Sequence, residues 1–313
     1  MRSGSTLTAN LVRHTPGDFY MFEPLFGIEY ALQRKKTRIQ FLNGTERNLT
    51  KNDYETLFPE MIYHWLTCNF DYLDLYGLTS HFIQQYTPEH RHYMECIRKP
   101  CNKDESDLEV VKRCILRLHT KCKKARTRTI KTIRLTINMV GKLLKWLPRL
   151  KIIHLVRDPR GILNSRFEQN LNKGNQLSIN AQELCDRLST DISTFRDLEF
   201  CHRSRMLRVV YEELCQYPRA VIEHSFTFLN SNVTTEVLDY AKRIMTGPVR
   251  SCSYCVGRGN ALKNAYRWLS VIDGDSLHTI DRHCSTVYSK LGYIPLDYDK
   301  LKHTLRSWQP MHI

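Results

Sequence analysis

Residues 150–166 read LKIIHLVRDPRGILNSR, and this stretch decides the fold class. Its first part, residues 151–156, is a short apolar run rich in β-branched side chains, which favours a buried strand over a helix. Asp158 and Pro159 follow as a helix N-cap and a first-turn proline. The stretch therefore predicts a strand, a polar turn and a helix. Such a turn in an open α/β sheet is a ligand site, and a helix N-terminus beside Arg157 favours an anion.

The amino terminus carries a second turn of this kind. Residues 3–6 read SGST and precede apolar residues at helical spacing up to about His14, so a loop is expected to lead into a helix. Backbone N–H groups there would face an anion, because Gly4 permits close approach and Ser5 and Thr6 add hydroxyl donors. An ordinary capped helix would show the same pattern, and that alternative stays open.

Helices and short apolar strands alternate along the rest of the chain. Strands are expected at residues 18–22, 129–135 and 206–211, and helices at 54–66, 107–119, 138–146, 180–199, 219–229, 233–245 and 276–291. Residues 31–127 are polar and broken by charge clusters, which indicates an irregular insertion. We therefore predict an α/β fold with a P-loop-like parallel sheet wrapped by helices, in a single domain spanning residues 1–313.

The charge balance points to acidic partners. The chain has 47 Lys and Arg against 32 Asp and Glu, a formal net charge of +15. A phosphorylated cofactor, a polyanionic glycan, nucleic acid or an anionic membrane surface would each suit it. Zinc-finger spacing and the aromatic signature of RNA-binding modules are absent from the sequence, so we expect no nucleic-acid partner.

The cysteine content indicates an oxidising compartment. Eleven cysteines are many for a cytosolic protein of 313 residues, so some are expected to be paired. Cys252 and Cys255 form a CxxC without a second pair at metal-site spacing, which favours a disulfide or packing over zinc, and we expect no metal site. Possible glycosylation sites at Asn43, Asn48 and Asn232 also favour a lumen of the secretory pathway.

The first residues, MRSGST, show neither a signal peptide nor an apolar run long enough to cross a bilayer. A chain rarely opens inside a phosphate-loop-like turn. We therefore expect the full-length protein to have a strand and a membrane anchor ahead of this sequence.

Two cationic turns, at residues 2–6 and 157–160, would suit a ligand with two separate anionic groups. A P-loop kinase or NTPase is one candidate for such a ligand. The GxxxxGK[ST] pattern is absent, however, and no lysine follows SGST to contact β- and γ-phosphates, which argues against ATP hydrolysis.

Several motifs in order resemble a known family. RSGST, FEPL, KTIRL, the central stretch, VVYEEL and a late RW pair together resemble the Golgi carbohydrate 6-O-sulfotransferases, which act on galactose, N-acetylglucosamine or N-acetylgalactosamine. The resemblance implies the donor 3′-phosphoadenosine 5′-phosphosulfate (PAPS) and transfer of sulfate to the 6-hydroxyl of galactose or N-acetylglucosamine in a glycan. It also implies a type II membrane protein of the Golgi lumen.

The resemblance assigns donor-binding residues by position. The loop for the 5′-phosphosulfate matches Arg2, Ser3, Gly4, Ser5 and Thr6. Arg157 and Ser165 match the pair that holds the 3′-phosphate. Because Ser165 lies about two helical turns into the helix that Arg157 precedes, both side chains can reach one anion near its start.

Glu23 is the candidate general base, because it follows a strand next to the loop, where related lumenal sulfotransferases keep a catalytic glutamate. It would take the proton from the acceptor hydroxyl while Arg2 steadies the departing phosphate. Alternatively, Glu23 only caps a turn before Pro24.

Other cationic residues have two interpretations each. Lys131 and Arg134 could reach the donor or acceptor, or Arg134 could pair with an acid such as Glu212. Arg258 and Arg267 are candidates for a nucleotide flap, and Trp268 could stack on adenine or belong to the core. The whole chain could also be a non-catalytic donor- or glycan-binding relic, because the strand entering the RSGST loop is missing from this sequence.

Overall fold

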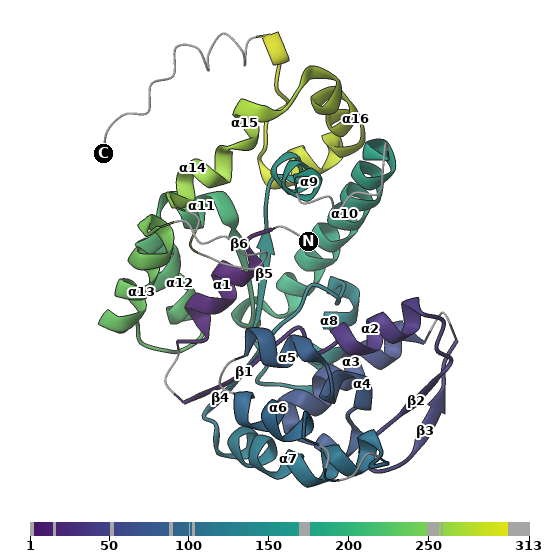
Figure 1. Cartoon of the computed structure of the whole chain (residues 1–313). Coiled ribbons are helices and arrows are strands. Elements are labelled where there is room, and N and C mark those ends of the chain that lie inside the picture. The colour runs from purple at the N-terminus through teal and green to yellow at the C-terminus, as the bar shows by residue number, and fades with distance from the viewer. Residues whose placement is uncertain are drawn as a thin grey trace. The chain divides into compact units, whose positions relative to one another are not determined.

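The computed structural model describes residues 3–14, 17–50, 53–87, 90–99, 101, 104–168, 176–248, 257 and 259–299. The contacts divide the chain into two compact units. Unit 1 comprises Met1–Leu11 and Lys151–Ile313, and unit 2 comprises Val12–Leu150. Each unit is described below by itself (Figure 1).

Unit 2 is built on a parallel strand pair. Strand β1 (Asp18–Phe22) pairs with β4 (Thr127–Lys131), with Phe22 opposite Lys131. Helices α2 (Phe26–Gln33), α3 (Tyr54–Thr67), α7 (Asp107–Lys124) and α8 (Ile137–Trp146) belong to the same unit. The core combines apolar side chains of these helices with β1 residues such as Met21, which is fully buried.

The predicted insertion, residues 31–127, lies within unit 2 and folds mainly as helices. Its elements are the antiparallel pair β2 (Arg38–Gln40) and β3 (Glu46–Asn48), the helices α3 and α7, and three short helices: α4 (Leu75–Leu78), α5 (His81–Tyr86) and α6 (Arg91–Ile97). Sequence periodicity predicted α3 and α7 but missed the three short helices, because four to seven residues are too few to show a period.

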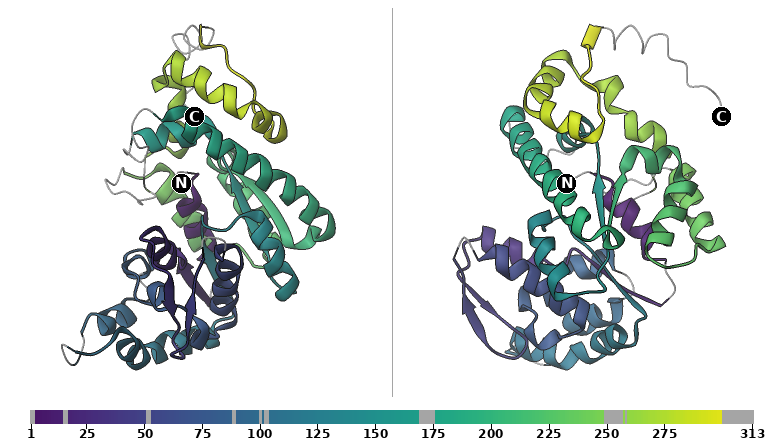
Figure 2. Two further views of the ribbon diagram at one scale, coloured as in Figure 1. Left: turned by 90° about the vertical axis from the view of Figure 1, so that its right-hand side faces the viewer. Right: turned by 180° about the vertical axis from the view of Figure 1, so that it is seen from behind.

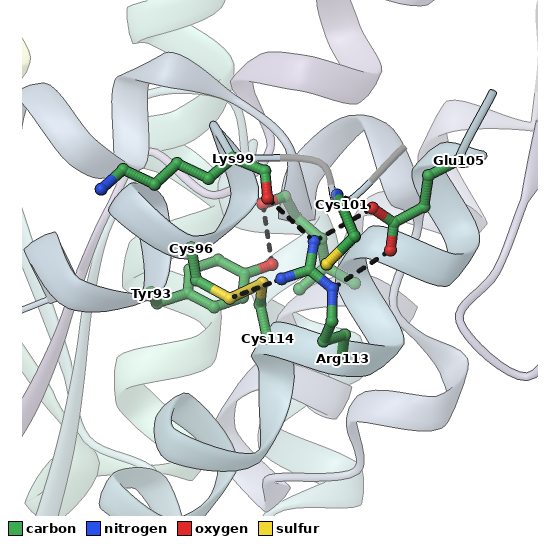
Figure 3. Close-up of a disulfide and its surroundings, with 8 residues drawn as sticks. Tyr93, Cys96, Lys99, Cys101, Glu105, Arg113 and Cys114 are labelled. Atoms are coloured by element: carbon green, nitrogen blue, oxygen red, sulfur yellow. Dashed lines mark hydrogen bonds and ion pairs between the residues drawn. A yellow bond between two sulfur atoms is a disulfide. The ribbon is translucent and has the colours of Figure 1, made fainter. Parts of the chain in front are cut away.

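Disulfides join helices in both units. Cys68–Cys122 and Cys96–Cys114 lie in unit 2, and Cys185–Cys284 lies in unit 1. Beside Cys96–Cys114, the Arg113 guanidinium donates to Glu105 and to the Lys99 carbonyl (Figure 3). The prediction that some cysteines pair is confirmed, whereas Cys252 and Cys255 lie outside the described residues.

Unit 1 contains the other parallel pair. Strand β5 (Ile152–Val156) pairs with β6 (Met206–Val210), so that Val156 lies opposite Val210. The helices after these strands are α9 (Pro159–Phe167) and α11 (Tyr211–Gln216). Parallel strands end at the same edge, so the residues that follow Val156 and Val210 are brought together.

The other α-helices described in unit 1 are α1 (Ser5–Val12), α10 (Leu177–Cys201), α12 (Pro218–Phe228), α13 (Thr235–Thr246), α14 (Ala261–Tyr266), α15 (Trp268–Val271) and α16 (Gly274–Leu291). Helices α10 and α16 lie side by side and carry the Cys185–Cys284 disulfide (Figure 2). Each long helix predicted from the sequence in this region is present within three residues of its expected ends.

The predicted α/β fold with parallel strands and surrounding helices is confirmed, with one parallel pair in each unit. Two predicted ends differ most from the structure: the helix predicted at residues 107–119 continues to Lys124 as α7, and the strand predicted at residues 129–135 spans Thr127–Lys131 as β4. Its partner strand ends at Phe22, and Glu23 has a φ of 50°, which turns the chain out of the ladder. None of the described helices is both long and apolar enough to cross a membrane.

Candidate functional site

The SGST loop is shaped by one glycine. Ser3 is buried, Gly4 has a φ of 84°, and the predicted helix is present as α1, which starts at Ser5, inside the stretch predicted as a turn. A Cβ on Gly4 would lie 2.1 Å from a ring carbon of Tyr211, so only glycine allows this approach. The Gly4 carbonyl accepts the Thr8 amide at 3.1 Å as a backbone bond of the first helical turn. The amides of the residues before Thr8 therefore lie at the N-terminus of the helix. Arg2 lies outside the described residues.

Arg157 is buried at the carboxyl end of β5, where the predicted turn lies. Its guanidinium carbon lies 4.5 Å from the centre of the Tyr211 ring, and one nitrogen donates to the Ala265 carbonyl at 3.4 Å. Its Nε atom is 3.9 Å from Oε1 of Glu212. The ring, the carbonyl and the carboxylate together fix the plane of this guanidinium, which suits a directional grip on an anion.

Helix α9 begins as the sequence predicts. Asp158 is the N-cap, and its carboxylate accepts the Arg160 amide at 2.9 Å. A Cβ on Gly161 would lie 3.2 Å from the Arg157 guanidinium. Ser165 follows Gly161 by four residues and therefore lies on the same helix face, one turn further on. Arg157 and Ser165 are thus on one side of α9, and their joint role stays a prediction.

Tyr211 connects the two predicted halves of the anion site. Gly4 packs against the edge of its ring, and Arg157 lies over the same ring. Burial raises the pKa of Tyr211 to about 12, so its hydroxyl stays protonated at neutral pH. Sequence analysis noted this residue only within the VVYEEL motif. No local signal in the sequence identifies its role, because only the parallel register of β5 and β6 puts Tyr211 beside Arg157.

Glu23, in unit 2, is held by cations. It is 2% exposed, and its Oε1 accepts from the Lys131 ammonium at 2.5 Å. The Oε2 atom accepts from Arg134 and, at 3.3 Å, from the Ile133 amide. The Glu23 amide donates to the Lys131 carbonyl at 2.7 Å, at the point where the chain leaves the β1–β4 pairing. Both carboxylate oxygens therefore have donors.

Two aromatic rings surround this charge cluster. The Lys131 ammonium lies 4.5 Å from the centre of the Phe22 ring, and Arg134 lies 5.1 Å from that of Phe26. Burial lowers the pKa of Lys131, while the Glu23 carboxylate opposes that effect. The cluster is a fixed arrangement of one carboxylate and two cations in a largely dry setting.

The remaining candidate site residues lie in different surroundings. Arg134 pairs with Glu23 and, at 2.5 Å, with Glu29 rather than with Glu212, so the suggested partner was wrong. Arg267 is exposed and forms an ion pair with Glu168 at 2.9 Å. Trp268 is 4% exposed and packs in the core of unit 1.

Two further expectations concern the flap and metals. Arg258 lies outside the described residues. Within the part of the chain that the structure describes, no group of three or more His, Cys, Asp or Glu side chains is arranged to hold a metal ion.

Comparisons with known proteins give a consistent result. A family model described as "Sulfotransferase family" matches residues 1–235. Carbohydrate sulfotransferase 1 of Danio rerio is 25% identical over 93% of this chain and 76% of that protein. Carbohydrate sulfotransferase 1 of Homo sapiens is 25% identical over 96% of this chain and 80% of that protein. A solved sulfotransferase domain from the curacin biosynthetic pathway has a TM-score of 0.46 and 14% identity, over 94% of this chain and 95% of that one.

Proposed function

Because the chain belongs to the sulfotransferase family, we propose that it transfers a sulfuryl group from PAPS to the 6-hydroxyl of a galactose or N-acetylglucosamine residue in a glycan. The carbohydrate sulfotransferases to which it is similar support a carbohydrate acceptor. The observation that carries the proposal is the meeting of Gly4 and Arg157 at one ring, that of Tyr211. A nucleotide with two separate anionic groups needs two neighbouring anion-binding elements, here the loop that contains Gly4 and the turn that contains Arg157.

In this proposal the SGST loop and Arg2 bind the 5′-phosphosulfate. The loop precedes α1, so backbone amides and the hydroxyls of Ser5 and Thr6 can donate to the anion. Arg157 and Ser165 bind the 3′-phosphate from the start and the second turn of α9. The contacts of Arg157 orient its guanidinium in advance, which reduces the entropic cost of binding.

The chemical step is an in-line displacement at sulfur. The acceptor hydroxyl oxygen forms a bond to sulfur while the bond from sulfur to the phosphate oxygen breaks, giving a sulfate ester and adenosine 3′,5′-bisphosphate. The hydroxyl proton passes to Glu23. Donors around the departing phosphate stabilise its charge, so positioning and electrostatics supply most of the rate enhancement.

The surroundings of Glu23 set a condition on its role as base. Both of its oxygens accept from Lys131, Arg134 or the Ile133 amide. A carboxylate has about four lone-pair sites, and these three donors leave about one of them for the acceptor hydroxyl. We assign Lys131 and Arg134 to holding the Glu23 carboxylate in position for that contact.

The test is donor binding and sulfate transfer by separate variants. With radiolabelled PAPS and acceptors ending in galactose or N-acetylglucosamine, the full-length protein should produce labelled glycan. Arg157→Ala should weaken binding of adenosine 3′,5′-bisphosphate by roughly 10- to 100-fold. Glu23→Ala should retain this binding and lower the transfer rate by roughly 10²- to 10⁴-fold.

Arg219→Ala serves as the matched control, because Arg219 is exposed and forms an ion pair with Glu223 on the same helix. It should bind and transfer as the wild type does. No transfer by the full-length protein, with donor binding intact, would favour the non-catalytic alternative. Normal transfer by Glu23→Ala would place the base elsewhere.

We also propose that the protein acts in the Golgi lumen. Three disulfides, two in unit 2 and one in unit 1, support an oxidising compartment. Immunofluorescence of the full-length protein with a Golgi marker tests this location.

A further inference from the structure

A short segment after α16 reaches back to the start of α9. Gly292 ends α16 with a φ of 78°, and the Tyr293 amide then donates to the Tyr288 carbonyl at 3.0 Å. Residues 292–294, here the C-terminal latch, lie outside residues 1–235, which the family model matches. Helices α9 and α16 contact each other within unit 1 (Figure 1).

The first contact of the latch is a hydroxyl on a buried carboxylate. The Tyr293 hydroxyl donates to Oε2 of Glu212 at 3.0 Å. The other oxygen, Oε1, accepts the Asp158 amide at 3.2 Å and lies 3.9 Å from Nε of Arg157. Because a carboxylate is planar and rigid, a bond that fixes one oxygen also orients the other. Tyr293 therefore orients the oxygen that faces Arg157.

The second contact holds the first turn of α9. Arg160 donates to the Ile294 carbonyl at 3.0 Å and pairs with Asp158 at 2.8 Å. Its guanidinium carbon lies 4.9 Å from the ring centre of Trp268 and 4.4 Å from that of Tyr288. These contacts restrict the conformations of the Arg160 side chain. Arg160 therefore connects the C-terminal latch to the first turn of α9 through a side chain that is held in one position.

Electrostatics support a hydroxyl donor at this point. Burial raises the pKa of Tyr293, and the nearby Glu212 carboxylate raises it further, so the hydroxyl keeps its proton. Burial also raises the pKa of Glu212, while Arg157 and the Asp158 amide oppose that effect. The Tyr293 hydrogen bond belongs to the same set of interactions that stabilise Glu212 in this buried position.

From these contacts we propose that the C-terminal latch positions Arg157 for the 3′-phosphate of the donor, with Tyr293 and Glu212 as positioning residues. The inference rests on the proposed function, in which Arg157 binds that phosphate. It adds a determinant of donor recognition from a part of the chain more than 130 residues away in sequence, since Tyr293 and Arg157 are separated by 136 positions.

The test compares two nucleotides that differ in one phosphate. Calorimetry on the full chain gives Kd for adenosine 3′,5′-bisphosphate and for adenosine 5′-phosphate. Tyr293→Phe removes one hydroxyl and should reduce the preference for the bisphosphate about three- to tenfold, the effect of weakening one hydrogen bond to a charged group. The Kd for adenosine 5′-phosphate should not change.

Tyr217→Phe is the matched control, because Tyr217 is 59% exposed in the same unit and should leave both Kd values as in the wild type. Glu212→Gln should also reduce the preference, and adding Tyr293→Phe to it should have little further effect. The expected result is a lack of additivity between the two substitutions, so the test does not depend on one single variant folding as well as the wild type.

The outcomes separate this inference from the proposed function. An unchanged preference in Tyr293→Phe, or an equal loss of affinity for both nucleotides, would overturn the latch while leaving the donor site in place. A wild-type protein with no preference for the bisphosphate would overturn the assignment of Arg157, and the latch with it.

Discussion

Asp74 shows how a single buried carboxylate makes stability depend on pH. It is 1% exposed, and its Oδ1 accepts the Gly77 amide at 2.6 Å as the N-cap of α4. Burial raises its pKa from 3.8 to about 6. Because the folded protein holds this proton more tightly than the unfolded chain, the stabilisation is complete below about pH 4 and is lost as the pH rises through 6.

Asp74→Asn should therefore increase stability at pH 7. Asparagine also caps helices and carries no charge to bury, so we expect a gain of about 1–2 kcal/mol at pH 7 and little change at pH 4. Urea unfolding at both pH values measures this. A variant less stable than the wild type at pH 7 would show that the carboxylate has a compensating partner when ionised.

Gly4→Ala tests the approach of the loop to Tyr211. The added Cβ would lie 2.1 Å from the ring at a φ of 84°, so the loop must move. Binding of adenosine 3′,5′-bisphosphate should weaken at least about tenfold, because loop amides are displaced from the anion. Gly44→Ala is the control, since Gly44 has a similar φ of 89° but its added Cβ would meet only Leu108, at an ordinary contact distance of 4.0 Å. Equal effects of both variants on binding would contradict this account.

At the scale of single residues, local signals in the sequence were sufficient to identify some candidate site residues and not others. Arg157 and Gly4 could be identified because their motifs are contiguous. The contacts of Tyr211 and Glu212 could not, because they depend on the register of β5 with β6. For Arg134, one of two interpretations was a pair with an acid such as Glu212; it does pair with acids, but with Glu23 and Glu29, and the pairing of β4 with β1 brings it to Glu23.

Among the elements, α7 has the strongest start signal. Ser106 accepts from the Glu109 amide, and the Glu109 carboxylate accepts the Ser106 amide at 2.9 Å, which is a capping box. Elements with such local signals were predicted well, as was α9 with its Asp158 cap. Strand β4 was predicted too long because its end is set by its partner, where Glu23 turns away, and not by its own sequence.

Ser106→Ala should destabilise the protein by about 1 kcal/mol, because the Glu109 amide loses the hydroxyl that accepts its hydrogen bond. Thermal unfolding and hydrogen exchange in the first turn of α7 measure the effect. Thr120→Ala, an exposed change inside the same helix, should be neutral or slightly stabilising, since alanine has the higher helix propensity. Equal destabilisation by both variants would argue against a specific cap.

On the scale of the whole molecule, the family resemblance seen in the sequence is confirmed by the family match and the carbohydrate sulfotransferase relatives. The division into two compact units was not predicted, because it depends on contacts between residues distant in sequence. The boundaries of a single domain and its insertion remain a prediction.

Residues 12–150, expressed alone in an oxidising compartment, should fold. This fragment contains a core of its own, with Trp65, Met21 and Leu57 buried, and both of its disulfides. A cooperative thermal transition and near-ultraviolet circular dichroism would show fixed packing. A fragment that is helical but lacks both signals would contradict the expectation.

The placement of the disulfides has a consequence for how the chain responds to proteolysis. Each bond between described cysteines closes a loop inside one unit, and none of these bonds joins residues of different units. Cleavage near residues 11 and 150 would therefore leave pieces with no described covalent link. On a denaturing gel without reductant, residues 12–150 should then migrate separately from residues 151–313, each still internally cross-linked.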